Sequence, residues 1–290
     1  MRTVSLEELL EAGCHFGHQV SRQNSKAREY IFEARDGIHI IDLEKTKEGL
    51  EDAAKFVKEI ARKNGTLLVL GTKRQAISVL DEQKKKIKEA GVDGIYFVTK
   101  RWIGGTLTNS SEVAKNYKKL KDIAEKLKDP SARSKYTKKE MSDLEKLRQK
   151  LEGFYGGIAQ MPTAPDALFI IDTHQEHVAA REANKAGIPA VGITDTNADP
   201  TIIDYPIPAN DDAVGSVKLL TDYIFDAWIE GRKNPIKAEE KKETKAEVKK
   251  EEKTEAKKEE PKKETKTEVK KEEKTEKTAK TPEKKTETTK

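Results

Sequence analysis

Short apolar runs alternate with longer amphipathic segments through most of this sequence, and this alternation limits the folds that are open to it. The apolar runs are rich in Val, Ile and Leu and predict strands. These strands fall at residues 38–41, 66–71, 94–98, 167–172 and 190–193, with helical patterns at residues 45–63, 74–89, 175–186 and 213–228. Strands that are apolar throughout are typical of a sheet buried on both faces. The sequence therefore predicts a doubly wound α/β domain with a mainly parallel sheet.

Residues 109–153 break this alternation and predict two consecutive helices. Residues 109–112 (NSSE) and 137–140 (TKKE) both have the spacing of a capping box, which starts a helix. A narrow apolar stripe follows each box, and the Pro of KDPS at residues 128–131 separates the two helices. We expect an inserted antiparallel helical hairpin of coiled-coil type. The first stripe is Val113, Tyr117, Leu120, Ala124 and Leu127, and the second is Met141, Leu144, Leu147 and Leu151.

The composition changes sharply near Arg232. Residues 233–290 contain 21 Lys and 16 Glu but no aromatic residue, so they cannot bury enough apolar surface to offset the entropy of ordering. We expect a disordered tail there, following an α/β domain at residues 1–232. That domain keeps 36 basic and 36 acidic residues of the chain's 57 and 52, so the net charge of +5 comes from the tail. Nucleic-acid binding must therefore be argued from local patches.

Other features limit the cellular setting. A single cysteine, Cys14, excludes a disulfide framework and is typical of a reducing compartment. The N-terminal stretch MRTVSLEELLEAG has three Glu and no continuous apolar segment, so it does not resemble a signal peptide. No apolar run is long enough to span a bilayer. We therefore expect a cytoplasmic protein with no membrane partner.

Basic residues gather in the predicted hairpin and after two predicted strands. Residues 109–152 have 13 Lys and Arg against 8 Asp and Glu, although a solvated helical face is an alternative explanation for this surplus. Lys73 and Arg74 follow one strand, and Lys100 and Arg101 follow the next. Ligands bind at the carboxyl edge of open α/β sheets, where these pairs would meet. The pairs and the hairpin are therefore predicted to form one phosphate-binding surface.

The same edge also offers residues for a different chemistry. Asp172, His174 and His177 follow one strand, and Asp195 and Asp199 follow the next, so they could hold a divalent ion. The alternative function is accordingly a flavodoxin-like nucleotide- or metal-dependent enzyme. However, the sequence has neither a GxxxxGK[ST] nor a GxGxxG motif. Asp, Thr and Asn also cap helices and form turns, and we favour that structural interpretation.

The stretch AGCHFGHQ places Cys14, His15 and His18 close together in sequence. It lacks a second ligand pair at zinc-finger spacing. A Cys beside a His in sequence is not a catalytic dyad either, because the base must reach the sulfur in space. We interpret the stretch as a loop after a helix at residues 6–12, with Gly13 as the C-cap and the histidines hydrogen-bonded or stacked.

Seven stretches, taken in order, resemble the sequence blocks of the bacterial small-subunit ribosomal protein 2 family. They are distributed over most of residues 1–231 in the family's order. They are AGCHFGHQ (12–19), REYIFEARDGIHIIDLEKT (28–46), GTKRQA (71–76), KRWIGGTLTN (100–109), GGIAQMPTAPDALFIID (156–172), EANKAGIPAVGITDTNADP (182–200) and IDYPIPANDDA (203–213).

The resemblance implies an α/β domain with an inserted helical hairpin and a structural role in the small ribosomal subunit. It implies no enzyme activity and no cofactor. The expected partners are small-subunit ribosomal RNA, bound between head and body, and neighbouring small-subunit proteins. These include the large messenger-binding ribosomal protein one, which the family helps to recruit.

The resemblance also implies RNA contacts at matched positions and, more loosely, along the basic hairpin. Trp102 or Phe16 could stack on an unpaired base, whereas strand packing explains His39 as well as RNA contact does. Cys14 and Ser25 depart from the family's pattern. The expected RNA-binding residues are His15, His18, Arg22, Lys26, Arg28, Lys73, Arg74, Lys100, Arg101, Trp102, Lys115, Lys118, Lys119, Arg133 and Lys135.

Overall fold

The computed structural model of the chain describes residues 3–129, 136–161 and 164–235. These belong to one compact unit, Met1–Pro235. Arg133, Lys135 and nearly all of the predicted tail lie outside the described residues, so the expectations for them stay predictions. The domain boundary near Arg232 also stays a prediction.

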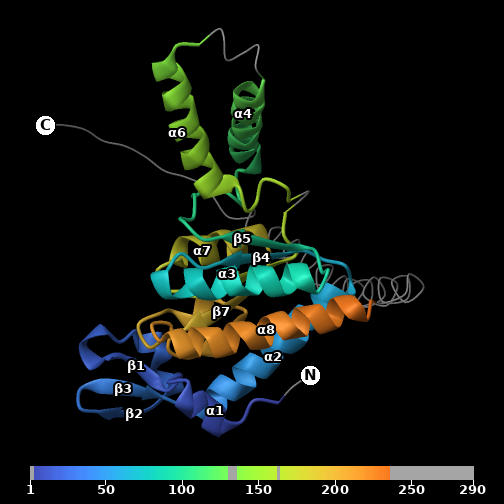
Figure 1. Ribbon diagram of the computed structural model, residues 1–290. Helices are drawn as coiled ribbons and strands as arrows, with labels where there is room; N and C mark the ends of the chain where they lie inside the picture. Colours follow the sequence, from blue (N-terminus) through green and yellow to red (C-terminus); the bar gives the residue numbers. More distant parts are fainter. Residues whose placement is uncertain (1–2, 130–135, 162–163, 236–290) are drawn as a thin grey trace, which may run out of the picture. The chain divides into compact units, whose positions relative to one another are not determined.

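Five parallel strands form the central sheet in the order β5-β4-β6-β7-β8 (Figure 1). The strands are β4 (Leu67–Leu70), β5 (Ile95–Val98), β6 (Ala167–Ile170), β7 (Ala190–Thr194) and β8 (Tyr205–Pro208). The chain runs from β4 outward to β5 and then returns past β4 to β6, so the direction of winding reverses between β4 and β6. In open α/β sheets, ligands bind beyond the carboxyl ends of the strands near such a reversal.

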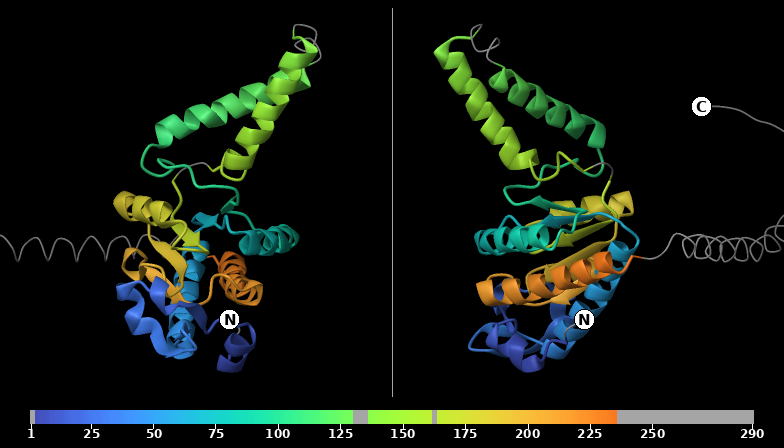
Figure 2. Two further views of the ribbon diagram at one scale, coloured as in Figure 1. Left: turned by 90° about the vertical axis from the view of Figure 1, so that its left-hand side faces the viewer. Right: turned by 45° about the vertical axis from the view of Figure 1, so that its right-hand side comes forward.

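Helices cover both faces of this sheet, which confirms the doubly wound α/β fold. Leu67 and Val69 pack in one core with α2 (Leu43–Arg62), α3 (Arg74–Glu89) and α8 (Val214–Lys233). Leu68 and Leu70, which alternate with them along β4, pack in a second core with α7 (His177–Ala186). Figure 2 shows these layers from two further sides. All four β4 side chains are fully buried, as the apolar sequence pattern predicts.

The assignment of residues 38–41 to the buried parallel sheet was wrong. They form β3 (Ile38–Ile41), which pairs antiparallel with β1 (Phe16–Gln19) and β2 (Ile31–Arg35) in a separate three-stranded sheet. Much of this sheet is exposed, since Ile41 in β3 is 2% exposed but four of the five residues of β2, including Phe32 at 72%, are exposed. Four residues are too few for the apolar pattern alone to distinguish these two environments.

A sequence signal for this hairpin was overlooked. Asp36 and Gly37 join β2 to β3, and their φ angles are 52° and 77°. Two consecutive positive φ values are typical of the tight turns that suit the twist of a hairpin, and Asp-Gly is a preferred pair there. The Asp-Gly pair between two apolar runs therefore indicated antiparallel pairing.

Strand β8 was also not predicted, because its sequence is YPIP. Proline cannot donate a backbone hydrogen bond, so it is rare inside a sheet but tolerated in an edge strand. β8 lies at the edge, paired through β7 alone. The shorter elements of the described chain are α1 (Leu6–Glu11), η1 (Val20–Arg22), η2 (Ser25–Tyr30) and η3 (Pro200–Ile202).

The two helices expected in residues 109–153 are present as α4 (Ser110–Lys128) and α6 (Lys138–Tyr155), which project from the β5 side of the sheet (Figure 1). We call this pair the arm. Thr137 and Glu140 form the predicted capping box at the start of α6. The box predicted at Asn109 is wrong, because the Asn109 side chain accepts a hydrogen bond from the Ser111 hydroxyl instead of capping a backbone amide.

The expected coiled coil along the arm is not confirmed. The aromatic rings of Tyr117 and Tyr155 meet edge to face at 5.4 Å, and Asn116 donates a hydrogen bond to the Tyr155 hydroxyl. Val113 and Tyr155 are buried in the second core, whereas most residues of the expected stripes are only half-buried. The described contacts therefore hold α4 against α6 and join the arm to the second core, but they leave much of its surface exposed.

Candidate nucleic-acid interface

The loops that follow the parallel strands meet at the carboxyl edge of the sheet, as expected. Lys73, which follows β4, joins three of them through its ammonium group. Its Nζ lies 3.2 Å from Asp172 Oδ2 beyond β6, and 2.8 Å and 2.6 Å from oxygens of Asp211 and Asp212 beyond β8. The Lys73 side chain is only 16% exposed. Its three donors therefore face carboxylates of the same molecule.

These contacts shift the pKa values of both partners. Burial disfavours the Lys73 ammonium, but the carboxylates, Asp211 foremost, outweigh that cost and raise the pKa of Lys73 above its ordinary value. Burial, followed by the negative charges of Asp172 and Asp195, raises the pKa of Asp211 to about 7 despite the contact with Lys73. Lys73 is thus a positively charged residue that links three aspartate side chains of the same molecule.

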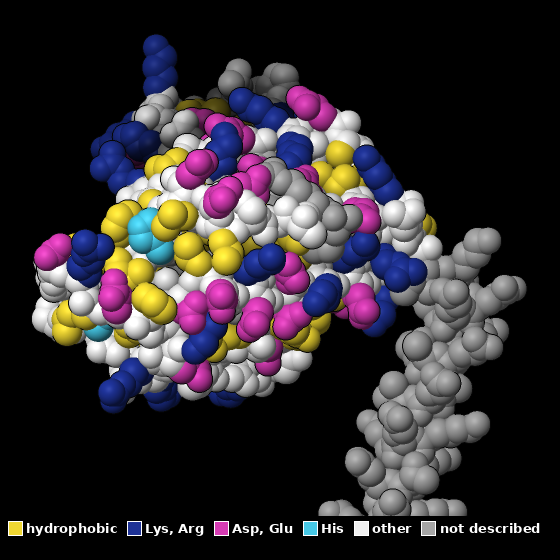
Figure 3. Space-filling view, turned by 90° about the horizontal axis from the view of Figure 1, so that it is seen from below, with side chains coloured by type: hydrophobic (Ala, Val, Ile, Leu, Met, Phe, Trp, Pro, Cys, Tyr) yellow, Lys and Arg dark blue, Asp and Glu magenta, His cyan; other side chains and the backbone are white. Residues whose placement is uncertain are grey.

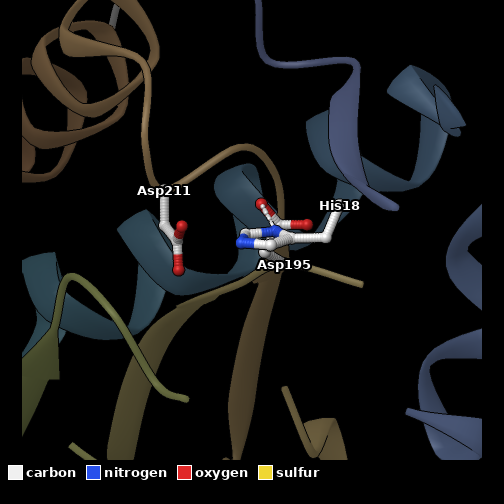
Figure 4. A group of neighbouring side chains, drawn as sticks. All are labelled: His18, Asp195 and Asp211. Carbon is white, nitrogen blue, oxygen red and sulfur yellow. Dashed lines mark ion pairs between the residues drawn. The ribbon is translucent and has the colours of Figure 1, made fainter. Parts of the chain in front are cut away.

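His18 crosses from β1 to the same edge (Figure 4). Its Nδ1 lies 3.0 Å from Asp195 Oδ2 and its Nε2 lies 3.4 Å from Asp212 Oδ2, and its backbone N–H donates to the Thr196 hydroxyl at 2.9 Å. The hydrogen bond with Asp195 is the largest influence and, with the nearby acids, raises the pKa of His18 against the effect of burial. His18 therefore joins the three-stranded sheet to the central sheet.

The other residues of AGCHFGHQ have structural surroundings. Cys14 is fully buried. α1 ends at Glu11 with Ala12 as its C-cap, one residue before the predicted cap, and Gly13 follows in the left-handed region with a φ of 76°. The His15 ring contacts the ring of Phe16 at 4.0 Å, and desolvation lowers the pKa of His15. Phe16 is 49% exposed and remains available for stacking. His39 is 5% exposed, which favours strand packing over RNA contact.

Three further expected RNA contacts lie in η1 and η2. Arg22, Lys26 and Arg28 are all exposed. The Lys26 ammonium contacts Asp199 Oδ2 at 2.7 Å and the Thr201 hydroxyl at 3.1 Å. Asp199 also accepts the backbone N–H of Thr201 and caps η3, which confirms its interpretation as a cap.

The loop after β5 carries the second Lys-Arg pair. Lys100 and Arg101 are exposed, and the ammonium of Lys100 lies 5.9 Å from the ring centre of Phe154 near the end of α6. Trp102 is 7% exposed and belongs to the second core, and its Nε1 donates to Glu182 Oε1 at 3.4 Å. Its ring is therefore packed in the core and unavailable for base stacking.

Exposed lysines line α4. Lys115 contacts Glu112 at 2.6 Å, an exposed pair one helical turn apart. Lys118 and Lys119 are exposed, and no ion pair with another described residue is recorded for either. Arg74, at the start of α3, is likewise exposed. The arm and the loop after β5 thus place exposed cations on neighbouring elements.

The opposite side of the unit has mixed charge. Figure 3 views it from the side of α2 and the three-stranded sheet and shows Lys and Arg interspersed with Asp and Glu. Apolar side chains gather around histidine on the same face. The three-stranded sheet and η1 have four large exposed apolar residues, Phe16, Val20, Phe32 and Ile38. This side is therefore less suited to an extended contact with phosphates.

The acidic and histidine residues that could have held a divalent ion are dispersed. His174 and His177 are exposed and hydrogen-bond to the backbone carbonyls of Asn197 and His174, respectively. Among the described residues, the group whose ligand atoms come close enough to share an ion is His18, Asp195 and Asp211, within 4.8 Å of one another. Sequence reasoning missed Asp211 and Asp212, because they follow the unrecognised strand β8.

Comparison with protein families identifies a relationship for this chain. The model of a family described as ribosomal protein S2 matches residues 9–231. The match begins within α1 and ends within α8, so it spans both sheets and the arm. Within the described residues, no helix is both long enough and apolar enough to cross a bilayer.

Proposed function

This chain belongs to the ribosomal protein S2 family of structural proteins of the small ribosomal subunit, and we propose that it binds small-subunit ribosomal RNA through its arm. Its cellular place is then the cytoplasmic ribosome, and its role is structural, without enzyme activity. The resemblance further supports a position between head and body and help in recruiting the large messenger-binding ribosomal protein one. A flavodoxin-like enzyme is not supported, although the strand order is compatible with that fold.

The observation that carries the proposal is the adjacency of exposed cations on the arm and on the loop after β5. Lys100 contacts the ring of Phe154 in α6, so this loop lies at the base of the arm. Lys118 and Lys119 extend the cationic surface along α4. Phosphates attract such unneutralised cations, and the attraction supplies most of the affinity of proteins for nucleic-acid backbones. We therefore place the main RNA contact on Lys100, Arg101 and the arm lysines.

Other expected contacts take different places in this proposal. We assign Lys73 and Trp102 structural roles, because the first faces three carboxylates and the second is packed in a core. Arg74 extends the main contact next to β4. His15 with Phe16, and Arg22 with Arg28, form a secondary contact beside the three-stranded sheet. The surface around the three-stranded sheet carries both positive and negative charge. We therefore expect the secondary contact to contribute less to the affinity than the main contact does.

The test measures binding to small-subunit ribosomal RNA as a function of salt. The full-length triple variant Arg101→Ala, Lys118→Ala, Lys119→Ala should bind more weakly than the wild type. The slope of log K against log salt should fall in magnitude by about 2–3, since each lost phosphate contact removes about 0.7–0.9. Filter binding over a salt series gives both quantities.

A matched variant separates this site from a general effect of charge. Lys55→Ala, Lys85→Ala, Lys88→Ala removes the same number of exposed lysine or arginine charges from α2 and α3. Its affinity should stay close to that of the wild type. Its slope of log K against log salt should differ from the wild-type slope by less than about 0.9, the value of one phosphate contact. Equal losses in the two triple variants would refute an arm-based contact and leave only non-specific attraction.

A further inference from the structure

A cluster of buried ionisable groups at the carboxyl edge is not explained by RNA binding. His18 comes from β1, Asp195 follows β7, and Asp211 follows β8, and one ligand atom from each lies within 4.8 Å of the others. Figure 4 shows the imidazole ring next to the Asp195 carboxylate, with the Asp211 carboxylate on the side of the ring nitrogens. Three segments that are distant in sequence thus converge on one point.

One carboxylate in this cluster has an oxygen without a partner. The Asp211 side chain is 1% exposed, and its Oδ1 accepts from Lys73. Its Oδ2 is buried and has no hydrogen-bond partner among the described residues. An unsatisfied buried carboxylate oxygen is costly, because no water or donor replaces its lost hydration.

The local balance of charge is also incomplete. Four carboxylates, those of Asp172, Asp195, Asp211 and Asp212, contact either Lys73 or His18. Only Lys73 supplies a permanent positive charge among these contacting groups, so the described ion pairs leave negative charge at the edge. A divalent cation would neutralise it and would satisfy the unpartnered oxygen.

An entry path for an ion exists beside the cluster. A surface hollow of about 250 Å³ is lined by His18, Asp195 and Asp212, with Arg22 also on its wall. Carboxylate oxygen and imidazole nitrogen are both common ligands of zinc, whereas magnesium prefers an all-oxygen shell. The mixed donors therefore favour an ion of the zinc class.

We propose that His18, Asp195 and Asp211 bind one divalent transition-metal ion of the zinc class. The ion fastens β1 to the carboxyl ends of β7 and β8 and so locks the three-stranded sheet onto the central sheet. Because such a site exists only in the folded chain, its binding energy adds to the stability of the fold. None of these three residues belongs to the arm. A test of the metal site can therefore fail without affecting the proposed RNA contact, and the reverse also holds.

The experiment uses metal-stripped, full-length protein and zinc ion alone as the probe. Calorimetric titration should show one equivalent bound, and magnesium at the same concentration should not compete. Zinc at about a hundredfold excess over Kd should raise Tm by about 5 °C or more. Amide exchange in residues 16–24 should slow when zinc binds, which reports the fastening of β1 directly.

Single substitutions identify the ligands. Asp211→Asn and His18→Gln should each lose the zinc-dependent rise in Tm and at least tenfold in affinity, while circular dichroism reports whether they remain folded. His174→Gln is the matched control, because it removes an exposed histidine from the same edge. Two ligand variants keep the test decisive if one fails to fold. Absence of stoichiometric zinc binding, equal binding by all variants, or preference for magnesium would overturn the proposal.

Discussion

The thiol of Cys14 is predicted to be inert in the folded protein. It is fully buried, and burial raises its pKa to about 11, although a hydrogen bond with Ser216 acts in the opposite direction. At about pH 8, alkylation by iodoacetamide should be about a hundredfold slower in the native protein than in urea-unfolded chains, because so little thiolate is present. Mass spectrometry of the alkylated fraction over time measures both rates, and similar rates would contradict a buried thiol.

The pH dependence of this group has a definite sign. Because the folded-state pKa lies above that of an unfolded thiol, protonated Cys14 favours the folded state below about pH 8.5. That contribution is lost as pH rises from the unfolded pKa toward the folded value of about 11. Unfolding in urea at increasing alkaline pH should therefore need less denaturant, and Cys14→Ala should weaken this part of the dependence.

Single residues also show how far sequence reasoning reaches. The pattern of basic residues identified Lys73 and Arg74 as an edge pair, and both lie there. Sequence could not show that Lys73 faces three carboxylates, because two of them, Asp211 and Asp212, lie almost 140 positions away. The charge of a side chain is visible in sequence, but its neutralisation depends on tertiary contacts.

At the scale of elements, the junction between the arm and β5 has almost no spare space. The backbone carbonyl of Gly157, just after α6, accepts from the N–H of Phe97 in β5 at 3.3 Å. A Cβ added at Gly157 would lie 2.0 Å from the carbonyl oxygen of Phe97, so backbone must move. Gly157→Ala should lower the free energy of unfolding by about 3 kcal/mol, measured by urea denaturation.

Gly104→Ala provides the matched control for that prediction. A Cβ at Gly104 would meet only Glu182 Oε1, at an ordinary 3.7 Å. Its free energy of unfolding should change by less than about 1 kcal/mol. If the two alanine variants were equally stable, the junction would be looser than its distances indicate.

Elements were predictable where the local pattern and the tertiary role agree. β4 and β6 are apolar throughout and lie inside the sheet, so their sequences identified them. β3 and β8 are also strands, but one belongs to a different sheet and the other carries prolines that only an edge tolerates. Their positions depend on partners distant in sequence, which a local pattern does not contain.

At the scale of the whole molecule, net charge is a poor guide to the RNA-binding surface. Residues 1–235 carry 37 basic and 36 acidic residues, while residues 236–290 carry 20 Lys and 16 Glu. The folded unit is thus nearly neutral overall, whereas residues 109–152, which include the arm, carry 13 Lys and Arg against 8 Asp and Glu. Such a distribution favours one oriented contact with a polyanion over general attraction.

Removal of the tail tests this separation of roles. A chain that ends at Pro235 should keep the Tm of the full chain, because the composition of residues 236–290 offers too little apolar surface for a core. It should also keep its affinity for small-subunit ribosomal RNA at about 0.15 M salt, where charges separated by more than about 8 Å are screened. At low salt, it should bind an unrelated RNA more weakly than the full chain does, because the tail supplies most of the net positive charge.

A chain whose tail is replaced by an uncharged Gly-Ser segment of equal length separates the effect of charge from the effect of length. It should behave like the truncated chain in all three measurements. The division of roles would be wrong if truncation reduced the affinity for small-subunit RNA as much as the arm triple variant does.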